Sequence, residues 1–228
     1  TCPSLELLNK IEKSNIFNKN QLYFLPDAII QIDEIKNKKN LINNREFDKS
    51  KKIVLAAGRL TKQKNFKYLI EEFEIFSKSQ KDYILVILGD GEEKNYLKKY
   101  ISSRKLNDKI YLMGRIENVY QYMRMSEVFV LSSLWEEVGF VIVEAAISNL
   151  FVISSNCPNG PSEFLDNGNH GILFEKNKKN KLSESLEAYL KLNKEKILNM
   201  RVKLKKESMK YTIFRHYLIF KNLLINEN

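Results

Sequence analysis

Five short apolar runs recur along the chain, each four to six residues long and each followed by a polar segment. They occupy residues 53–57, 83–88, 110–113, 128–131 and 151–154. Apolar residues fill these runs without alternating with polar ones, and strands of that kind are covered on both faces, as in a parallel sheet. The pattern therefore predicts a parallel sheet with helices packed on both of its sides.

The segments between the runs have the spacing of amphipathic helices. Asn65 is placed to cap one helix and Asn118 to start another. The apolar stripes are Phe66, Leu69, Ile70, Phe73 and Phe76 in the first helix and Val119, Tyr122 and Met123 in the second. Strand and helix alternate over about 49–179, which predicts a Rossmann-like, doubly wound α/β domain. With the helices that follow, we expect this domain to occupy 49–205 and its ligand to lie at the carboxyl ends of the strands.

Both ends of the chain are expected to lie outside this domain. Residues 1–48 contain a helix, an extended piece at 22–26 and a polar helix or linker, with too few apolar residues for a separate core. Because the chain opens without Met on what reads as the end of a helix, we interpret 1–48 as the remnant of a preceding, largely missing domain and an interdomain linker. Residues 206–228, with a last helix over 211–224, are expected to cross back to that domain.

The net charge of +10 comes mainly from lysines scattered among asparagines and isoleucines, as in 176–181. Such lysines are typical of a solvated surface, and they leave open a peripheral contact with the anionic inner face of the plasma membrane. No recognition helix, zinc pattern or aromatic-basic repeat is present, so no nucleic acid is expected as a partner. No apolar run approaches the ~20 residues that cross a bilayer. Cys2 and Cys157 lack metal-ligand spacing, so we expect a cytoplasmic protein with reduced thiols.

The most informative polar segment follows the fourth run, over 133–146. It places Glu136 and Glu144 on either side of a Gly139-Phe140 step that opens an apolar helix, with Glu144 expected about two turns into it. The first N–H groups of a helix lack internal partners and carry the positive end of its dipole, which predicts an anion cradle at this step. Since carboxylates accept hydrogen bonds from paired sugar hydroxyls, the segment suits a phosphate joined to two sugars, as in a nucleotide sugar.

A basic loop with Gly58, Arg59 and Lys64 follows the first run. The Gly-x-Gly-x-x-Gly pattern of a dinucleotide site is absent, so binding of nicotinamide or flavin by this route is not expected. Arginine holds phosphate oxygens through a bidentate fork, and lysine supplies a compact charge. Because this loop and the Gly139 step both lie at carboxyl ends of strands, they predict a phosphate clamp.

The loops after the second and third runs are less distinctive. We interpret Gly89-Asp90-Gly91 as a tight turn. Arg115 and Ile116 are placed to offer backbone groups to a base edge. These two loops complete the expected rim of the ligand site.

Neither covalent nor metal chemistry is expected. Cys157 has no recognisable partnership with either histidine, and no Asp-x-Asp pair or His/Asp cluster suggests a divalent metal. Charge on a departing diphosphate would then be balanced by Arg59, Lys64 and the helix N-terminus, without metal or cofactor. Glu163, in the helix after the fifth run, is expected to favour that helix electrostatically.

Taken in order, these motifs resemble the C-terminal, donor-binding half of GT-B glycosyltransferases of family 4, over about 22–174. The resemblance rests on Gly58-Arg59 with Lys64, Gly89-Asp90-Gly91, Gly114, Glu136 and Glu144 around Gly139-Phe140, and Pro161-x-Glu163. The stretch 155–163 is similar to one found in bacterial polysaccharide, lipopolysaccharide and capsule transferases. The chain departs from the family pattern at Glu137-Val138, where Gly-Phe is frequent, and around 26–28, where an Asn-Gly or Asn-Pro turn is usual.

The resemblance implies a retaining transfer of a sugar from a nucleotide diphosphate, which we expect to be UDP, to a glycan or lipid-linked glycan. It implies that Arg59 and Lys64 contact the diphosphate, Glu136 the donor sugar and Glu144 the ribose. The implied donor site comprises Gly58, Arg59, Lys64, Arg115, Ile116, Glu136, Gly139, Phe140, Val141 and Glu144, of which Arg59, Lys64 and Glu136 would be catalytic. The acceptor would bind to the preceding domain, so we expect this chain alone to bind donor without transferring sugar.

Two other functions remain open at this point. Nucleotide-sugar 2-epimerases also use the GT-B architecture, and product analysis without an acceptor separates them from transferases. A noncatalytic module that anchors a partner or a membrane is the other alternative. Its binding would survive loss of both Glu136 and Glu144.

Overall fold

The structure is a computed structural model that describes residues 1–37, 47, 48 and 50–226 of the chain. Its centre is a six-stranded sheet in which every neighbouring pair of strands is parallel, in the order β3-β2-β1-β4-β5-β6. The strands are β1 (Lys52–Ala57), β2 (Tyr83–Leu88), β3 (Ile110–Gly114), β4 (Val128–Leu131), β5 (Phe151–Ser155) and β6 (Ile172–Phe174). This order confirms the predicted Rossmann-like, doubly wound fold and places its switch point between β1 and β4.

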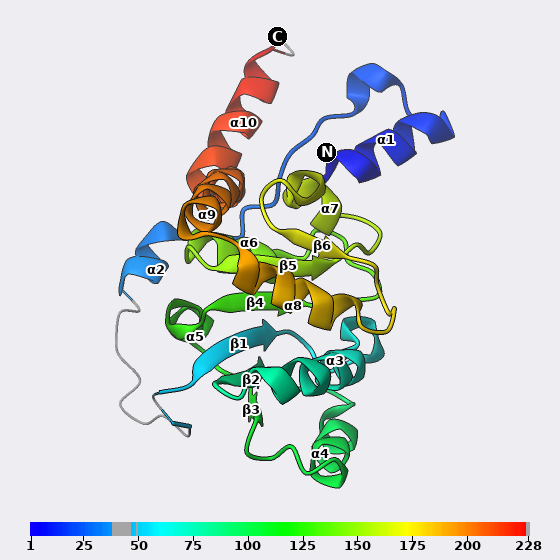
Figure 1. Ribbon diagram of the computed structural model, residues 1–228. Helices are drawn as coiled ribbons and strands as arrows, with labels where there is room; N and C mark the ends of the chain where they lie inside the picture. The colour runs from blue at the N-terminus through cyan, green and yellow to red at the C-terminus, as the bar shows by residue number, and fades with distance from the viewer. Residues whose placement is uncertain (38–46, 49, 227–228) are drawn as a thin grey trace.

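Helices cover both faces of the sheet (Figure 1). The first face packs against α3 (Phe66–Ser79), α4 (Lys94–Ser103) and α8 (Lys181–Lys191). The second packs against α5 (Val119–Met125), α6 (Phe140–Ile147) and the end of α9 (Lys194–Ser208). Because Met200 belongs to the first core and Leu204 to the second, α9 closes the protein beside β5 and β6.

Strand β1 shows why its run is apolar throughout. Ile53 and Leu55 are buried in one core, whereas Val54 and Ala56 are buried in the other. Successive side chains of a strand point to opposite faces, so a strand covered on both sides needs an apolar residue at every position. The runs in β2, β4 and β5 are buried in the same way, whereas the edge strand β3 is only partly buried after Ile110.

Strand β6 was not predicted from the sequence. It has only three residues, and polar segments flank it on both sides. The strand pairs with β5 from Ile153↔Ile172 to Ser155↔Phe174. Gly171 precedes it, and a Cβ at that position would lie 2.6 Å from the carbonyl oxygen of Val152, so close backbone approach at the edge of β5 requires glycine there.

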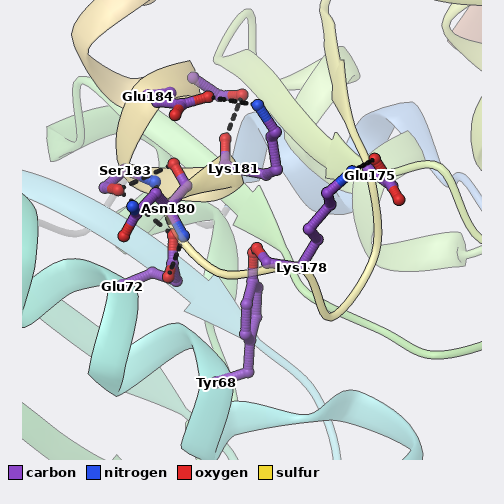
Figure 2. A network of polar contacts seen from close by, with 9 residues as sticks. Tyr68, Glu72, Glu175, Lys178, Asn180, Lys181, Ser183 and Glu184 are labelled. Carbon is purple, nitrogen blue, oxygen red and sulfur yellow. Dashed lines mark hydrogen bonds and ion pairs between the residues drawn. The ribbon is translucent and has the colours of Figure 1, made fainter.

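Buried Glu72 joins α3 to the start of α8 (Figure 2). Its carboxylate accepts hydrogen bonds from the N–H groups of Asn180 at 2.8 Å and Ser183 at 3.1 Å. Nearby, the Tyr68 hydroxyl donates to the carbonyl oxygen of Lys178 at 2.7 Å. A buried carboxylate is stabilised here by the otherwise unpaired N–H groups at a helix start, which fixes the two helices relative to each other.

The last helix begins later than the sequence predicted. Helix α9 continues through the expected 205/206 boundary to Ser208, a 3-10 turn covers Met209–Tyr211, and α10 spans Ile213–Asn226. Residue 211 does not join the last helix because its carbonyl accepts the N–H groups of Ile29 and Ile30, and Thr212, with an extended backbone, then caps α10 through its hydroxyl.

The N-terminal residues form α1 (Leu5–Ser14), a 3-10 turn (Lys19–Gln21), an extended segment and α2 (Ile32–Asn37). A parallel bridge joins Cys2 to Phe24. Residues 38–46, within the predicted polar helix or linker that ends at residue 48, lie outside the described residues. Helices α1 and α10 both extend from the end of the protein that carries β5 and β6 (Figure 1).

Glu163 contacts the start of α1, which lies 158 residues earlier in the chain. It lies in α7 (Pro161–Phe164), and its carboxylate oxygens accept the N–H groups of Leu5 and Glu6, each at 3.1 Å. A second contact joins the Asn159 side chain to the Lys10 ammonium at 2.5 Å. The carboxylate expected to favour its own helix thus caps another helix whose N–H groups lack internal partners.

Replacing Glu163 by alanine is expected to release α1 without unfolding the sheet. The loss of an N-terminal cap costs about 0.5–2 kcal/mol, so amide hydrogen exchange in 5–14 should accelerate by roughly 2- to 30-fold. Hydrogen exchange with mass spectrometry measures this directly, with exposed Glu187→Ala as the control. Unchanged exchange in α1 would show that other contacts hold this helix.

Candidate functional site

A cavity of about 570 Å³ lies at the carboxyl ends of the strands, on the β1 side of the switch point. It is bounded by the loops after β1, β2 and β3 and by the start of α6, the helix that follows β4. The lining residues are Ala57, Gly58, Arg59, Leu88, Gly89, Asp90, Arg115, Ile116, Val119, Phe140, Val141 and Glu144. Ligands of doubly wound folds bind at this position, so we refer to this cavity as the switch-point cleft.

Two other hollows of similar size lie elsewhere. One, of about 610 Å³, lies along α9 and the start of β6, and another, of about 750 Å³, lies between α2 and α10. Neither contains a residue that the sequence singled out for chemistry. The switch-point cleft is therefore the candidate site.

Close backbone contacts form the floor of this cleft. The N–H of Gly58 donates to the carbonyl oxygen of Leu88 at 3.0 Å, and the N–H of Gly89 donates to that of Gly114 at 2.7 Å. Gly89 has a φ of +141°, and a Cβ there would lie 1.9 Å from the carbonyl oxygen of Gly58. No other residue fits this crossing, so the Gly89-Asp90-Gly91 motif has a structural role, as the turn interpretation proposed.

The cleft is rich in positive charge. Arg59 and Arg115 are exposed, and neither guanidinium has a hydrogen-bond or ion-pair partner in the described part of the chain. Asp90, which also lines the cleft, pairs with the Lys94 ammonium at 2.6 Å and accepts a hydrogen bond from the N–H of Gly91. The hydrogen bond from Lys94 is the main reason that the pKa of Asp90 is lowered. An anion entering the cleft thus meets two free arginines.

The start of α6 adds unpaired N–H groups to this charge. Gly139, at the N-cap, has a left-handed backbone with φ of 75°. The N–H groups of Phe140 and Val141 have no acceptor within the described residues. Free N–H groups and the positive end of the helix dipole attract an anion. The geometry therefore supports the predicted anion cradle.

Glu144 is the second acid that lines this cleft. It is the fifth residue of α6, so it lies about one turn into the helix. The expectation of about two turns was therefore wrong. Burial raises the pKa of its carboxyl group. Its carboxylate has no hydrogen-bond donor among the residues that the structure describes. A partly buried carboxylate without a partner is available to accept hydrogen bonds from ligand hydroxyls.

Glu144→Gln is expected to raise stability at neutral pH. A carboxyl group whose pKa is higher in the folded protein binds protons more readily there than in the unfolded chain. Its contribution to the free energy of unfolding therefore falls as pH rises from 4.5, the ordinary pKa, through the raised folded pKa, and stays low at neutral pH. Melting curves should show a gain for the variant at neutral pH that shrinks as pH falls through this window. A pH-independent difference would contradict this account.

Lys64 and Glu136 form a buried ion pair directly behind the cleft wall. The ammonium lies 2.5 Å from Oε1 of Glu136, and the two side chains are 14% and 7% exposed. A Cβ on Gly58 would lie 3.2 Å from Cε of Lys64, and one on Gly139 would lie 3.7 Å from Cγ of Glu136. The pair therefore lies against Gly58, which lines the cleft, and against Gly139 at the start of α6.

The structure brings the ten predicted donor-site residues to one region. Those that line the cleft are Gly58, Arg59, Arg115, Ile116, Phe140, Val141 and Glu144. Lys64, Glu136 and Gly139 are not part of this lining but adjoin it, Lys64 beside Gly58 and Glu136 beside Gly139. Sequence reasoning missed two residues: Asp90, which lines the cleft, and Ser133, whose hydroxyl donates to Glu136. The only signal for Ser133 was its place three residues before the glutamate.

The remaining candidates have structural contacts. Burial raises the pKa of the Cys157 thiol, so this cysteine is a poor nucleophile. A ring nitrogen of His216 lies 2.7 Å from the carbonyl oxygen of Pro26. Within the described ranges, no group of three or more His, Cys, Asp or Glu residues could hold a metal ion. No described helix is long and apolar enough to span a bilayer.

The family model described as Glycosyl transferases group 1 matches residues 37–211. An uncharacterized glycosyltransferase from Methanocaldococcus jannaschii is 35% identical over 149 residues, which make up 64% of this chain and 37% of that protein. A UDP-Gal:alpha-D-GlcNAc-diphosphoundecaprenol alpha-1,3-galactosyltransferase from Escherichia coli is 34% identical over 151 residues, which cover 65% of this chain and 38% of that protein. The chain thus spans well under half the length of these two relatives.

Solved structures show the same fold. A mutant of TarM from Staphylococcus aureus, in complex with Fondaparinux, alpha-GlcNAc-glycerol and UDP, superposes with a TM-score of 0.79. The match covers 97% of this chain and 43% of that one, at 21% sequence identity. At this identity, the likeness shows that the two chains share a fold.

Proposed function

Because this chain belongs to the Glycosyl transferases group 1 family, we propose that it is the donor-binding half of a retaining GT-B glycosyltransferase of family 4. The proposed donor is a UDP-linked sugar, and the proposed acceptor is a glycan or lipid-linked glycan of cell-surface polysaccharide synthesis. One observation carries the proposal: free arginines, an unpaired helix start and a partner-free glutamate line a single cleft. These groups match the diphosphate and the ribose of a nucleotide sugar.

The charges support diphosphate binding at the mouth of the cleft. Arg59 is free to form a bidentate contact with phosphate oxygens, and the N–H groups of Phe140 and Val141 are free to donate hydrogen bonds to other phosphate oxygens. Lys64 lies behind Gly58 and adds a third positive group. In a transfer reaction these donors stabilise the charge that develops on the departing diphosphate, which is the largest electrostatic demand of the step. The proposed reaction therefore needs no metal.

The two glutamates divide the recognition of the donor. Glu144 is open to the cleft and partner-free, so it is the proposed acceptor of hydrogen bonds from the ribose hydroxyls. Glu136 lies next to Gly139 at the start of α6, and it is the proposed contact of the transferred sugar. The Escherichia coli relative carries UDP-Gal in its name, and the TarM mutant was crystallised with UDP, which favours uridine as the base.

Titration calorimetry tests this function on the 228-residue chain. UDP should bind more tightly than GDP and ADP, and addition of EDTA should leave its affinity unchanged. UDP-sugars should bind without being transferred to a diphosphoundecaprenol-linked glycan. Absence of heat with all three diphosphates at millimolar concentration would refute the donor-binding assignment. A UDP affinity that disappears with EDTA would refute only metal independence.

We propose in addition that α9 contacts an anionic membrane face. It carries five lysines and one arginine over 15 residues, together with exposed Leu198 and Val202. Juxtamembrane lysines each gain about 1 kcal/mol at such a surface. Vesicles with phosphatidylglycerol should therefore sediment the chain, whereas pure phosphatidylcholine vesicles should not, and Lys205→Glu should weaken the effect.

A further inference from the structure

Two donors converge on one oxygen of the buried Glu136 carboxylate. Oε1 accepts the Lys64 ammonium at 2.5 Å and the Ser133 hydroxyl at 2.5 Å. Ser133 is fully buried, and Glu136 is nearly so. Oε2 has no donor among the residues described here. The carboxylate is therefore held by one oxygen, and the other is left for a further partner.

The segment that carries Ser133 is held on all sides. The Ser155 hydroxyl donates to the carbonyl oxygen of Ser133 at 2.7 Å, and the N–H of Glu136 donates to that of Pro158 at 3.2 Å. The N–H of Leu134 donates to the carbonyl oxygen of Gln63 at 2.8 Å. Contacts with the end of β5, the loop after β5 and the loop after β1 fix the position of this backbone before any ligand arrives. Such preorganisation favours precise binding.

The two donors differ in what a diphosphate does to them. Lys64 passes behind Gly58 at the cleft wall, so a bound diphosphate competes with Glu136 for its ammonium. Ser133 is neutral and buried, and no anion in the cleft competes for its proton. When Lys64 turns toward phosphate, the serine hydroxyl is the donor that still holds the carboxylate. Without it, a buried charge would lose its remaining partner.

We propose that Ser133 is a positioning residue for recognition of the transferred sugar. Its hydroxyl keeps Oε1 of Glu136 occupied while Lys64 binds the diphosphate, so that Oε2 accepts a hydroxyl of the donor sugar. This inference rests on the proposed function and extends it with a residue that acts through Glu136. The specificity of the site for a sugar, as distinct from a nucleoside diphosphate, then depends on a serine that the ligand does not touch.

The test compares UDP with UDP-glucose, UDP-galactose and UDP-N-acetylglucosamine on the whole chain. Trp135, the single tryptophan, adjoins Glu136 and is half exposed, so its fluorescence reports binding at this loop. Ser133→Ala should weaken the best UDP-sugar by about tenfold and leave UDP affinity unchanged. Ser133→Cys, similar in size but a weaker donor, should give an intermediate loss and serves if the alanine variant does not fold.

The matched control is Ser208→Ala, which removes another fully buried hydroxyl with one hydrogen bond, on α9. It should leave the difference between UDP-sugar and UDP unchanged. Equal weakening of UDP and UDP-sugar by Ser133→Ala would overturn the positioning role and leave the proposed function intact. So would equal affinities of the wild-type chain for both ligands. A wild-type chain that binds no uridine nucleotide would overturn both proposals.

Discussion

Arg59→Ala is expected to weaken binding of UDP by about 10- to 100-fold while leaving the melting temperature unchanged. The guanidinium is exposed at the cleft wall and has no partner in the described chain, so its removal breaks no contact of the ligand-free protein. A charge-assisted, bidentate contact with phosphate contributes about 1.5–3 kcal/mol, which corresponds to this loss. Calorimetry with UDP measures it.

Arg104→Ala is the control for this variant. Arg104 is equally an exposed arginine, but it lies at the end of α4, where it pairs with Glu74. The Arg104→Ala variant should bind UDP with the affinity of the wild-type chain. An Arg59→Ala protein with wild-type affinity would show that the phosphates do not lie at the β1 loop.

Lys64→Met is expected to lower the free energy of unfolding by about 3–5 kcal/mol, because removal of one partner of a buried ion pair leaves the other uncompensated. Glu136 would keep only the Ser133 hydroxyl as a donor. For a chain of this size the melting temperature should fall by roughly 10 °C. Urea unfolding of the variant, and of Lys64→Met combined with Glu136→Gln, measures the effect. The double variant should recover much of the loss because it leaves no buried charge.

Lys94→Met provides the matched comparison for Lys64. Lys94 pairs with Asp90 at 2.6 Å, but both side chains are substantially exposed, and exposed pairs contribute little to stability. The urea midpoint of the Lys94→Met variant should stay close to that of the wild-type chain. If Lys64→Met and Lys94→Met were equally stable, the Lys64–Glu136 pair would be solvated and not buried.

The sheet was predictable because its strands are buried on both faces. That condition places an apolar residue at each position of β1 after the exposed Lys52, and the same pattern marks β2, β4 and most of β5. β6 was not predicted because a strand of three residues is too short to show a hydrophobic pattern in the sequence. The beginning of α10 was misplaced for a different reason. The carbonyl oxygen of Tyr211 accepts hydrogen bonds from the N–H groups of Ile29 and Ile30. Local helix propensity does not predict such a contact between distant parts of the chain.

The candidate site was predictable to the level of loops but not of contacts. Arg59 and Glu136 were singled out because parallel strands bring their following loops to one edge. The pairing of Lys64 with Glu136 joins positions 72 residues apart, and the capping of α1 by Glu163 joins positions 158 apart. Such pairs depend on the exact path of each loop. The role of Ser133 followed only from the short distance to the carboxylate, because a serine beside a glutamate is unremarkable in sequence.

The stability and the function of the cleft are expected to oppose each other. Glu144 is held partly buried without a donor, which raises its pKa and disfavours its charged form. A ligand with paired hydroxyls supplies the missing donors. The same carboxylate therefore lowers the stability of the ligand-free protein and raises its affinity for the ligand. Glu144→Gln should thus separate the two properties, with higher stability and weaker nucleotide binding.

A crystal structure of the chain with a UDP-sugar tests the central claim most directly. We expect the diphosphate between Arg59 and the N–H groups of Phe140 and Val141, the ribose hydroxyls on Glu144, and the sugar near Glu136. Density for the nucleotide along α9, between α2 and α10, or at the cleft in a reversed orientation with the sugar on Glu144 would contradict it.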